Sequence, residues 1–352
     1  MFITGTGTAT PPKRYLQSEC WDAALDEPSI QKLSPRSRAL IKKVLLGNNG
    51  IRSRHLAMDS ISEAFDTSPD TLHARFKKYA PSVATSAAEQ ALAAATQRPE
   101  AIDALIVSTC TGYLCPGLSS YLAENLKLRP DVFALDLVGQ GCGAALPNLR
   151  TAHACIQSQG CEHVLSVSVE ICSAAFYLDD DPGVLISACL FGDAAGAAVL
   201  SRKAPDRSRR VEWRHSTSLL DPAKRDLLRF ESTGGRLRNI LTPQVPELAG
   251  VFAEKVLTHL LADASVDQSE IRTWILHAGG RDVLLSLRDH LRLDETDLCW
   301  SARVLRDLGN ISSPFVLHVL HSALTEQAPA GWWFMSSFGA GFSCHGALLH
   351  VE

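Results

Sequence analysis

The chain has 352 residues and a mass of 38.1 kDa, with 46% hydrophobic and 20% charged residues, a composition typical of globular proteins. A chain of this length can bury two cores or form one large double domain. The 34 basic and 38 acidic residues are spread along the sequence and give a net charge of -4. Without a basic block or an acidic tail, the composition argues against nucleic acid as a partner.

Targeting and metal-binding signals are absent from the sequence pattern. Residues 1–15 do not contain a basic segment followed by a long apolar run, and no later stretch reaches the roughly 20 apolar residues of a membrane span. Ten cysteines are scattered along the chain, and no second pair or histidine pair accompanies Cys110 and Cys115. We therefore expect a soluble chain in a reducing cytoplasm, without a membrane span or a metal site.

The first half of the chain alternates helix and strand patterns. Ser34, Pro35 and Gly47 are typical of a helix as its cap, first residue and terminator, and an alanine-rich segment predicts a second helix from about residue 81 to residue 95. A continuously apolar, β-branched run predicts a fully buried strand at residues 104–109, and two further runs predict strands at residues 132–137 and 163–170. Such alternation is typical of a mainly parallel, layered α/β sheet.

Similar elements begin again after a charged stretch at residues 202–210. The segment ALIVSTCTG at 104–112 is similar to TWILHAGG at 273–280, and LFGDAAGAAVL at 190–200 is similar to SFGAGFSCHGALL at 337–349. Two matches in the same order indicate an internal duplication. We predict two halves, residues 1–205 and 206–352.

Cys142 lies between glycines in the segment GQGCG, ahead of a helix of small residues that begins near Gly143. The glycines allow a tight strand-to-helix turn and a close approach of substrate to the backbone. At a helix start, the exposed amides and the helix dipole favour thiolate and can hold a thioester oxyanion. The pattern indicates a nucleophile, and the alternative is a buried cysteine in a turn that admits only small residues.

His277 and Asn310 lie at similar junctions. His277 ends a predicted strand and precedes the sequence Ala-Gly-Gly, so its side chain is expected above a helix start. Asn310 follows a glycine in a turn that opens an apolar helix. Taken alone, the histidine could be structural and the asparagine a helix cap. Together with Cys142 they form a Cys, His, Asn set, which favours catalysis.

A set in this order resembles the condensing enzymes of the thiolase-like superfamily, and six segments resemble type III polyketide synthases, the chalcone synthase-like family. The segments are IVSTCTGYLCPG, GCGAALPNL, VSVEICSAAF, LFGDAAGAAVL, WILHAGGRDVL and GNISSPFVL, within roughly residues 100–345. Initiating ketoacyl synthases are the alternative within the superfamily, but they usually carry a second asparagine soon after the histidine. The resemblance implies an α/β, thiolase-like duplicated αβαβα layered fold.

The resemblance also implies a mechanism, in which coenzyme A thioesters are substrates and no further cofactor is needed. Cys142 would attack the starter acyl-CoA, with His277 stabilising the thiolate as an ion pair. His277 and Asn310 would then donate hydrogen bonds to the thioester oxygen of malonyl-CoA as carbon dioxide leaves. The resulting enolate would attack the acyl group on Cys142.

Substrate-binding residues are implied by the same resemblance. Phe191 would be an aromatic gate between the coenzyme A channel and the cavity, unless it only packs in the core. Lys42 and Lys43 lie where the family binds coenzyme A, although a solvated helix face also explains the lysines. Gly279 and Gly280 are expected to contact coenzyme A as well. The cavity is expected to be lined by Cys110, Thr111, Cys172, Ala175, Leu228, Leu237 and Ser312.

The family is homodimeric, and the resemblance places Cys115, ahead of a proline, in the cavity of the other subunit. Leu228 takes the place of a small glycine of chalcone-forming relatives, while Cys172 and Ala175 replace polar threonines. We therefore predict a fatty acyl-CoA starter that gives alkylpyrone or alkylresorcinol-type products. The alternatives are a tetrahydroxynaphthalene-type synthase that uses malonyl-CoA alone, an initiating ketoacyl synthase, a cysteine hydrolase from outside the superfamily and a non-catalytic relative.

Overall fold

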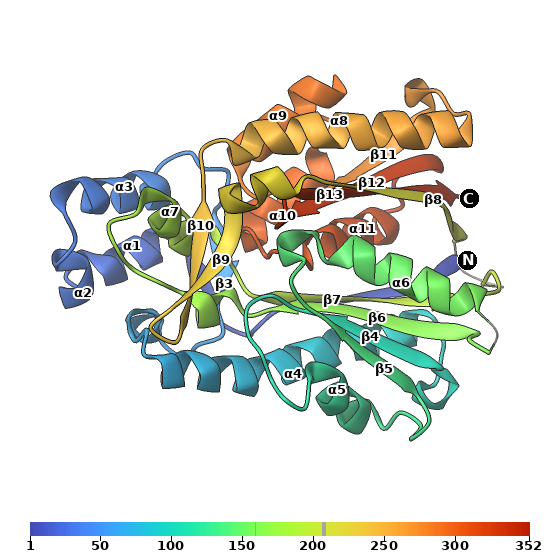
Figure 1. Ribbon diagram of the computed structural model, residues 1–352, viewed down its shortest axis with the longest axis horizontal. Helices are drawn as coiled ribbons and strands as arrows, with labels where there is room; N and C mark the ends of the chain where they lie inside the picture. The colour runs from blue at the N-terminus through green and yellow to red at the C-terminus, as the bar shows by residue number, and fades with distance from the viewer. Residues whose placement is uncertain (159, 206–208) are drawn as a thin grey trace.

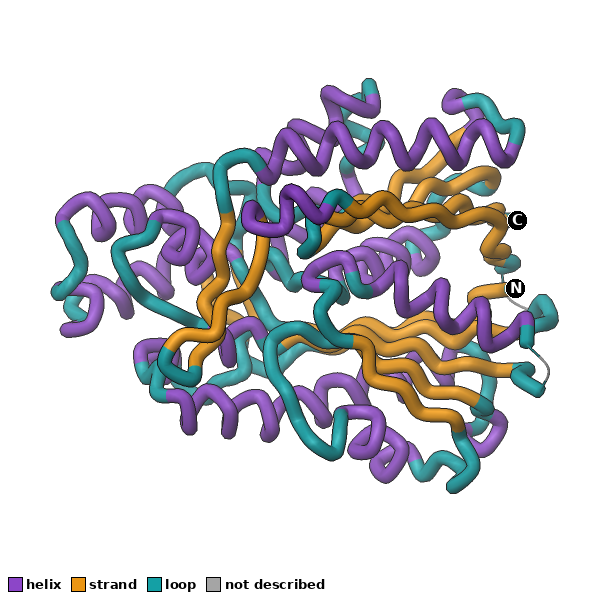
Figure 2. The backbone as a smooth tube through the Cα atoms, in the orientation of Figure 1, coloured by secondary structure: helices purple, strands orange, loops and turns teal. Residues whose placement is uncertain are grey.

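The structure, a computed structural model, describes residues 1–158, 160–205 and 209–352. Its centre is a nine-stranded sheet with the order β11-β12-β13-β8-β1-β7-β6-β4-β5 (Figures 1 and 2). The sheet consists of two half-sheets that meet where Phe2 of β1 pairs with Glu212 of β8. The strands are β1 (Phe2–Ala9), β4 (Ala104–Ser108), β5 (Phe133–Leu137), β6 (His163–Glu170), β7 (Ala194–Ser201), β8 (Val211–Leu220), β11 (Ile271–Leu276), β12 (Gly331–Gly339) and β13 (Ser343–Val351).

Helices form three layers around these half-sheets (Figure 1). The middle layer contains α6 (Ala145–Gln157) and α11 (Phe315–Thr325). The outer faces are covered by two pairs of helices, α4 (Pro69–Ala94) with α5 (Leu118–Leu126), and α8 (Val245–Ala264) with α9 (Arg281–Leu291). This arrangement confirms the predicted αβαβα layered fold. The expectation of a mainly parallel sheet is wrong, because among the described strands only β4–β5, β4–β6 and β11–β12 pair in parallel and the other strand pairs of this sheet are antiparallel.

The internal duplication is visible in the strand order. From their junction outward, the half-sheets run β1-β7-β6-β4-β5 and β8-β13-β12-β11, so β7 corresponds to β13 and β4 to β11. The two pairs of similar segments fall on these corresponding strands. The division after residue 205 lies in the connection between β7 and β8. Residues 206–208 of that connection lie outside the described residues, and the boundary stays a prediction.

Most of the predicted local elements are confirmed. The apolar runs form β4, β5 and β6 within one residue of their predicted limits, and every residue of β4 is buried. Helix α3 (Pro35–Leu46) begins as predicted, because the Ser34 side chain accepts a hydrogen bond from the Ser37 amide and Pro35 occupies the first turn.

The alanine-rich helix is longer than predicted. Helix α4 begins at Pro69, where the Ser68 side chain accepts a hydrogen bond from the backbone, and it runs through Pro81. The expected start near residue 81 is therefore wrong. One buried stripe continues across the proline, and packing against the sheet stabilises the helix on both sides of it. The stripe contains Leu72, Phe76, Ala80, Ala84, Ala87 and Ala91.

Smaller elements lie beyond one end of the half-sheets, opposite the two chain termini (Figure 1). None of the helices within the described ranges is long and apolar enough to cross a membrane. The smaller elements are β2 (Arg14–Leu16), α1 (Gln17–Leu25), α2 (Pro28–Gln31), α3, β3 (Ser53–His55), α7 (Pro182–Leu190) and the hairpin of β9 (Leu228–Thr233) and β10 (Arg236–Leu241).

Candidate active site

Loops from both halves bring the predicted catalytic residues together. Cys142 lies in the 3-10 turn η3 (Gly141–Gly143) between β5 and α6, and His277 directly follows β11. Strand β12 holds both, since Ser337 Oγ donates to the carbonyl of Gly143 at 3.0 Å and the amide of His277 donates to the carbonyl of Ser336 at 2.9 Å. The turn that carries Cys142 and the residue His277 are therefore both held by β12.

Asn310 lies between α10 (Cys299–Leu308) and α11 and completes the group. Its Nδ2 donates to the carbonyl of Gly279 at 3.1 Å, and its Oδ1 accepts from the amide of Ser312 at 2.9 Å. Ser312 Oγ in turn donates to Cys142 Sγ at 3.2 Å. The cysteine, the asparagine and the loop after the histidine are thus joined through hydrogen bonds.

The His277 ring is enclosed by aromatic rings. It is 1% exposed and meets Phe315 and Phe338 edge to face, with ring centroids 5.1 and 4.9 Å away. Neither ring nitrogen has a hydrogen-bond partner among the described residues. Burial lowers the pKa of His277 to about 3, so the imidazole is neutral at pH 7 and one ring nitrogen is free to accept a proton.

The Cys142 thiol is also held in its neutral form. Burial raises its pKa to about 12, against a smaller opposing effect of the hydrogen bond from Ser312. Helix α6 begins only at Ala145, three residues after the cysteine. The thiolate expected at a helix start is therefore not the form that this environment favours without substrate, and Cys142 bonds to Ser312 in place of an ion pair with His277.

A small cavity, called the triad cavity below, reaches Ser312, the hydrogen-bond donor to Cys142, and has about 20 Å³ open to the centre of a water molecule. Cys142, His277 and Asn310 themselves do not line it. Five of the expected residues line it, namely Thr111, Cys172, Ala175, Phe191 and Ser312. The other walls come from α7, from the segment before it and from the β9–β10 hairpin. They contribute Phe176, Tyr177, Val184, Ser187, Ala188, Phe230 and Asn239.

The hairpin contributes different residues from those expected. Leu228 is buried in the main core and Leu237 pairs with Ser232, whereas the lining residues are Phe230 and Asn239, which pair with each other. Leu228 and Phe230 lie on one face of β9, and Leu237 and Asn239 lie on one face of β10, two residues apart in each strand. The assignments of Leu228 and Leu237 to the cavity wall are therefore wrong by two positions, because Leu228 lies where β9 enters the core and Leu237 lies next to the hairpin turn.

Comparisons with known proteins agree with this geometry. Residues 28–219 match the family described as FAE1/Type III polyketide synthase-like protein, and residues 226–351 match the C-terminal domain of chalcone and stilbene synthases. The chain belongs to the type III polyketide synthases. It is therefore an acyltransferase-type enzyme and not a cysteine hydrolase.

Individual relatives cover nearly the whole chain. The 1,3,6,8-tetrahydroxynaphthalene synthase of Streptomyces peucetius subsp. caesius is 30% identical over 99% of this chain and 92% of its own length. The alpha-pyrone synthesis polyketide synthase-like Pks18 of Mycobacterium tuberculosis is 26% identical over 99% of this chain and 91% of its own. The structure of PKS-I from the brown alga Ectocarpus siliculosus superposes with a TM-score of 0.90, at 24% identity, over 99% of this chain and 98% of the alga's, which supports the fold.

The residues expected at the coenzyme A channel and at a partner's cavity lie outside the cavity of this type III polyketide synthase chain. Lys42 and Lys43 are exposed on α3, with the Lys42 ammonium 5.7 Å from the Trp21 ring. Gly279 accepts the hydrogen bond from Asn310, and Gly280 precedes α9. Cys115 is exposed in the loop after β4. Cys115 does not line the cavity of its own chain, and its place in a partner's cavity stays a prediction.

A buried carboxylate below the triad was missed in the sequence, where Glu170 only ends an apolar strand. Glu170 is fully buried and accepts hydrogen bonds from Thr111 Oγ1 at 2.9 Å, the Cys110 amide at 3.0 Å and Ser313 Oγ at 2.6 Å. Burial raises its pKa. Cys110 Sγ lies 3.3 Å from Glu170 Oε1 and 3.7 Å from Ser312 Oγ, so Cys110 belongs to this network. It does not line the cavity, and its assignment to the cavity wall is wrong.

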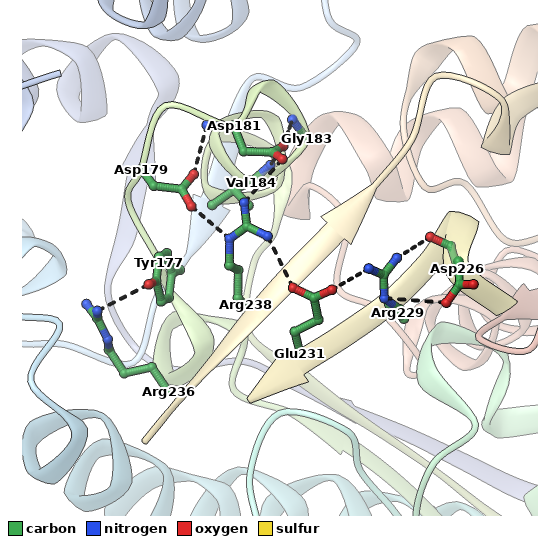
Figure 3. Close-up of polar contacts among 10 residues, drawn as sticks. All are labelled: Tyr177, Asp179, Asp181, Gly183, Val184, Asp226, Arg229, Glu231, Arg236 and Arg238. Atoms are coloured by element: carbon green, nitrogen blue, oxygen red, sulfur yellow. Dashed lines mark hydrogen bonds and ion pairs between the residues drawn. The ribbon is translucent and has the colours of Figure 1, made fainter. Parts of the chain in front are cut away.

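A charged network ties the hairpin to the segment before α7 (Figure 3). Arg238 of β10 bonds to Asp179 at 2.7 Å, to Asp181 at 3.2 Å and to Glu231 of β9 at 3.3 Å. Asp181 also accepts from the first amides of α7, the helix that ends next to Phe191. Arg238 thus connects two walls of the cavity from outside.

Proposed function

We propose that this type III polyketide synthase carries an acyl group from a coenzyme A thioester on Cys142 and extends it by decarboxylative condensation with malonyl-CoA. The observation that carries the proposal is the hydrogen-bonded group of Cys142, Ser312 and Asn310, which lies beside the buried His277. The His277 ring nitrogens have no partner among the described residues, and Ser312 lines a largely apolar cavity. A cysteine, a base and an amide donor are the groups that this chemistry requires.

Loading starts from the neutral pair. The Cys142 thiol gives its proton to a ring nitrogen of His277 as sulfur attacks the starter thioester, a C–S bond forms, and the coenzyme A thiol leaves with a proton. The high pKa of the thiol and the low pKa of the imidazole imply that the proton moves only when the substrate is in place. Closure around the starter would strengthen the interaction between the charged forms.

Extension uses the same side chains as donors. Asn310 Nδ2 has one hydrogen on Gly279 and a second one free for the thioester oxygen of malonyl-CoA. With His277 it would stabilise the enolate formed as the carboxylate leaves as carbon dioxide. The enolate carbon then attacks the acyl carbonyl on Cys142, and the lengthened chain leaves on coenzyme A. Lys42, Lys43, Gly279 and Gly280 are our proposed contacts for the coenzyme A part.

For the starter, we propose a fatty acyl-CoA, giving alkylpyrone or alkylresorcinol-type products. Cys172, Ala175 and Phe191 give the cavity small or apolar walls, as an alkyl chain requires. Each buried methylene would add about 0.8 kcal/mol to binding. The name of the Pks18 relative refers to alpha-pyrone synthesis, which supports such a product.

One observation favours a second candidate, a synthase that uses malonyl-CoA alone and forms a tetrahydroxynaphthalene-type product. The cavity is small, and a long chain would have to displace side chains of its wall. A relative with 30% identity bears the name of such a synthase. Both candidates use the same triad and differ only in what the cavity accepts.

A starter panel with radiolabelled malonyl-CoA separates the two candidates. For the fatty acyl starter, kcat/KM should rise from hexanoyl-CoA to dodecanoyl-CoA, and Ala175→Trp should shorten the longest accepted chain while malonyl-CoA decarboxylation continues. A flat or falling series, with a product formed from malonyl-CoA alone, would favour the second candidate. An absence of any condensation product would overturn the proposed function.

We also propose a cytoplasmic homodimer in which Cys115 reaches the cavity of the partner subunit. Tyr113 in the same loop is 72% exposed, which leaves a large apolar ring available for a subunit contact. The ten free cysteines suit a reducing compartment. Light scattering should give about twice the 38.1 kDa chain mass, and a mass near 38.1 kDa at micromolar concentration would contradict the dimer.

A further inference from the structure

A second cavity lies behind the wall of the triad cavity. It is bounded by α1, α3, α7 and the 3-10 helix η1 (Ile61–Phe65). The centre of a water molecule can occupy about 60 Å³ of this cavity. Phe176 and Ala188 line both cavities and separate them. Among the described residues that line the second cavity, Arg54 alone is charged. Typical apolar members are Ala24, Ile41, Leu45, Ala64, Phe65 and Leu185.

Arg54 is a buried cation, and no carboxylate among the described residues forms an ion pair with it. It is 3% exposed, and both hydrogen bonds of its guanidinium leave from Nη1, to the carbonyls of Ala188 at 2.7 Å and Phe191 at 2.8 Å. Its Nε has no partner among the described residues. The two carbonyls at the end of α7 offset only part of the charge. A buried charge is normally paired, since desolvation without a counter-ion is costly.

We propose that this second cavity binds a free carboxylic acid of short to medium chain length, with its carboxylate on Arg54 and its alkyl chain among α1, α3 and η1. A guanidinium edge can take both oxygens of a carboxylate, and Nη1 is already occupied. The ligand would therefore bind along the edge that contains Nε, which is buried and which the side chains around it must uncover. The apolar walls then remove the chain from water.

The volume sets the length of the chain. A cavity needs roughly 10–15 Å³ of such space for each water molecule, so about 60 Å³ corresponds to roughly four to six waters, near the size of an acid with about six carbons. A fatty acyl-CoA starter has no free carboxylate and carries a large head group. The site is therefore distinct from the proposed starter site, although a bound acid would touch Phe176 and Ala188 from behind.

Titration calorimetry with hexanoate and with 1-hexanol tests the proposal on the full chain. Hexanoate should bind saturably with one site per chain, and 1-hexanol at least about tenfold more weakly, because it cannot form the charged pair. Arg54→Met should weaken hexanoate by a similar factor. Ala64→Leu, which fills the cavity and leaves Arg54 intact, should also weaken the binding of hexanoate. This variant tests the proposal if Arg54→Met fails to fold.

The matched control is Ala175→Leu, which fills the triad cavity and should leave hexanoate binding unchanged. The proposal is overturned if wild type does not bind hexanoate up to its solubility limit, or if hexanoate and 1-hexanol bind equally. It is also overturned if Ala175→Leu abolishes binding while Ala64→Leu does not, since the acid would then lie in the triad cavity.

Discussion

The two halves of the duplicated fold use corresponding strand ends in opposite ways. Strand β4 leads into Thr109 and Cys110, whose polar groups converge on the buried carboxylate of Glu170. Strand β11 leads into His277, whose ring nitrogens have no partner among the described residues and whose faces meet aromatic rings. One half therefore builds a polar, hydrogen-bonded floor, and the other builds an apolar enclosure for a neutral base.

The two regions therefore differ in role: the network around Glu170 holds its neighbours in place, and His277 is available to react. A fully bonded group such as Glu170 fixes its neighbours, because each donor would lose a partner if it moved. An unbonded imidazole is poised to take a proton or donate a hydrogen bond when substrate arrives. The largest effects on catalysis should thus come from the enclosure, and the largest effects on stability from the floor.

Removing His277 or its neighbour Asn310 should have the largest effect on the rate of catalysis. His277→Ala or Asn310→Ala should lower malonyl-CoA decarboxylation by about 100- to 1000-fold each, the usual loss for one donor to a developing oxyanion. The rate of labelled carbon dioxide release measures this. Asn125→Ala, an exposed asparagine bonded to Thr85, is the matched control and should leave the rate unchanged. Equal rates for all three variants would remove His277 and Asn310 from the mechanism.

The protonation of the resting pair gives a second effect, on the reactivity of the Cys142 thiol with pH. With the pKa of Cys142 at about 12, the thiolate fraction grows with pH, so alkylation of Cys142 by iodoacetamide should speed up about tenfold per pH unit from about pH 6 to pH 9. Peptide mass spectrometry follows the Cys142 adduct over time. A rate that stays constant over this range would show a preformed thiolate and imidazolium pair.

The contribution of the hydrogen bonds to Glu170, which form the floor, can be tested by measuring the stability of the fold. Glu170→Gln keeps the shape but faces some of the donors with an amide NH₂ group, so the free energy of unfolding should fall by about 1–3 kcal/mol. Urea denaturation measures it. Glu162→Gln in the same segment removes only a surface ion pair with Arg202 and should change stability by less than about 1 kcal/mol. Similar losses in both variants would contradict a special role for the floor.

The smallest effect is expected outside the cavity. Arg238→Met should loosen the β9–β10 hairpin, raising the KM for the starter a few-fold with a smaller change in kcat, and lowering the free energy of unfolding by up to about 1 kcal/mol. Arg210→Met, which removes a surface ion pair with Glu352, is the control. If both variants have the same KM, the network does not position the cavity wall.

The sequence was informative where local chemistry decides the structure. Apolar β-branched runs fix β4, β5 and β6, and glycines beside Cys142 fix its turn. It was silent where distant segments meet. Phe230 and Asn239 face the cavity because of how the hairpin packs on the segment before α7, and the pKa values of Cys142 and His277 follow from burial by residues far along the chain. Arg54 likewise stands out only once the structure shows it buried, with no counter-ion among the residues that the structure describes.

The central claim is that Cys142 carries the growing chain, and peptide mapping of acylated wild-type protein tests it most directly. After brief incubation with a starter acyl-CoA and a quench, the acyl mass should appear on the Cys142 peptide and on none of the other nine cysteines. Cys110 is the most informative of these, since its sulfur lies near the same Ser312 hydroxyl. Acylation of Cys110 or Cys172 in place of Cys142 would contradict the account.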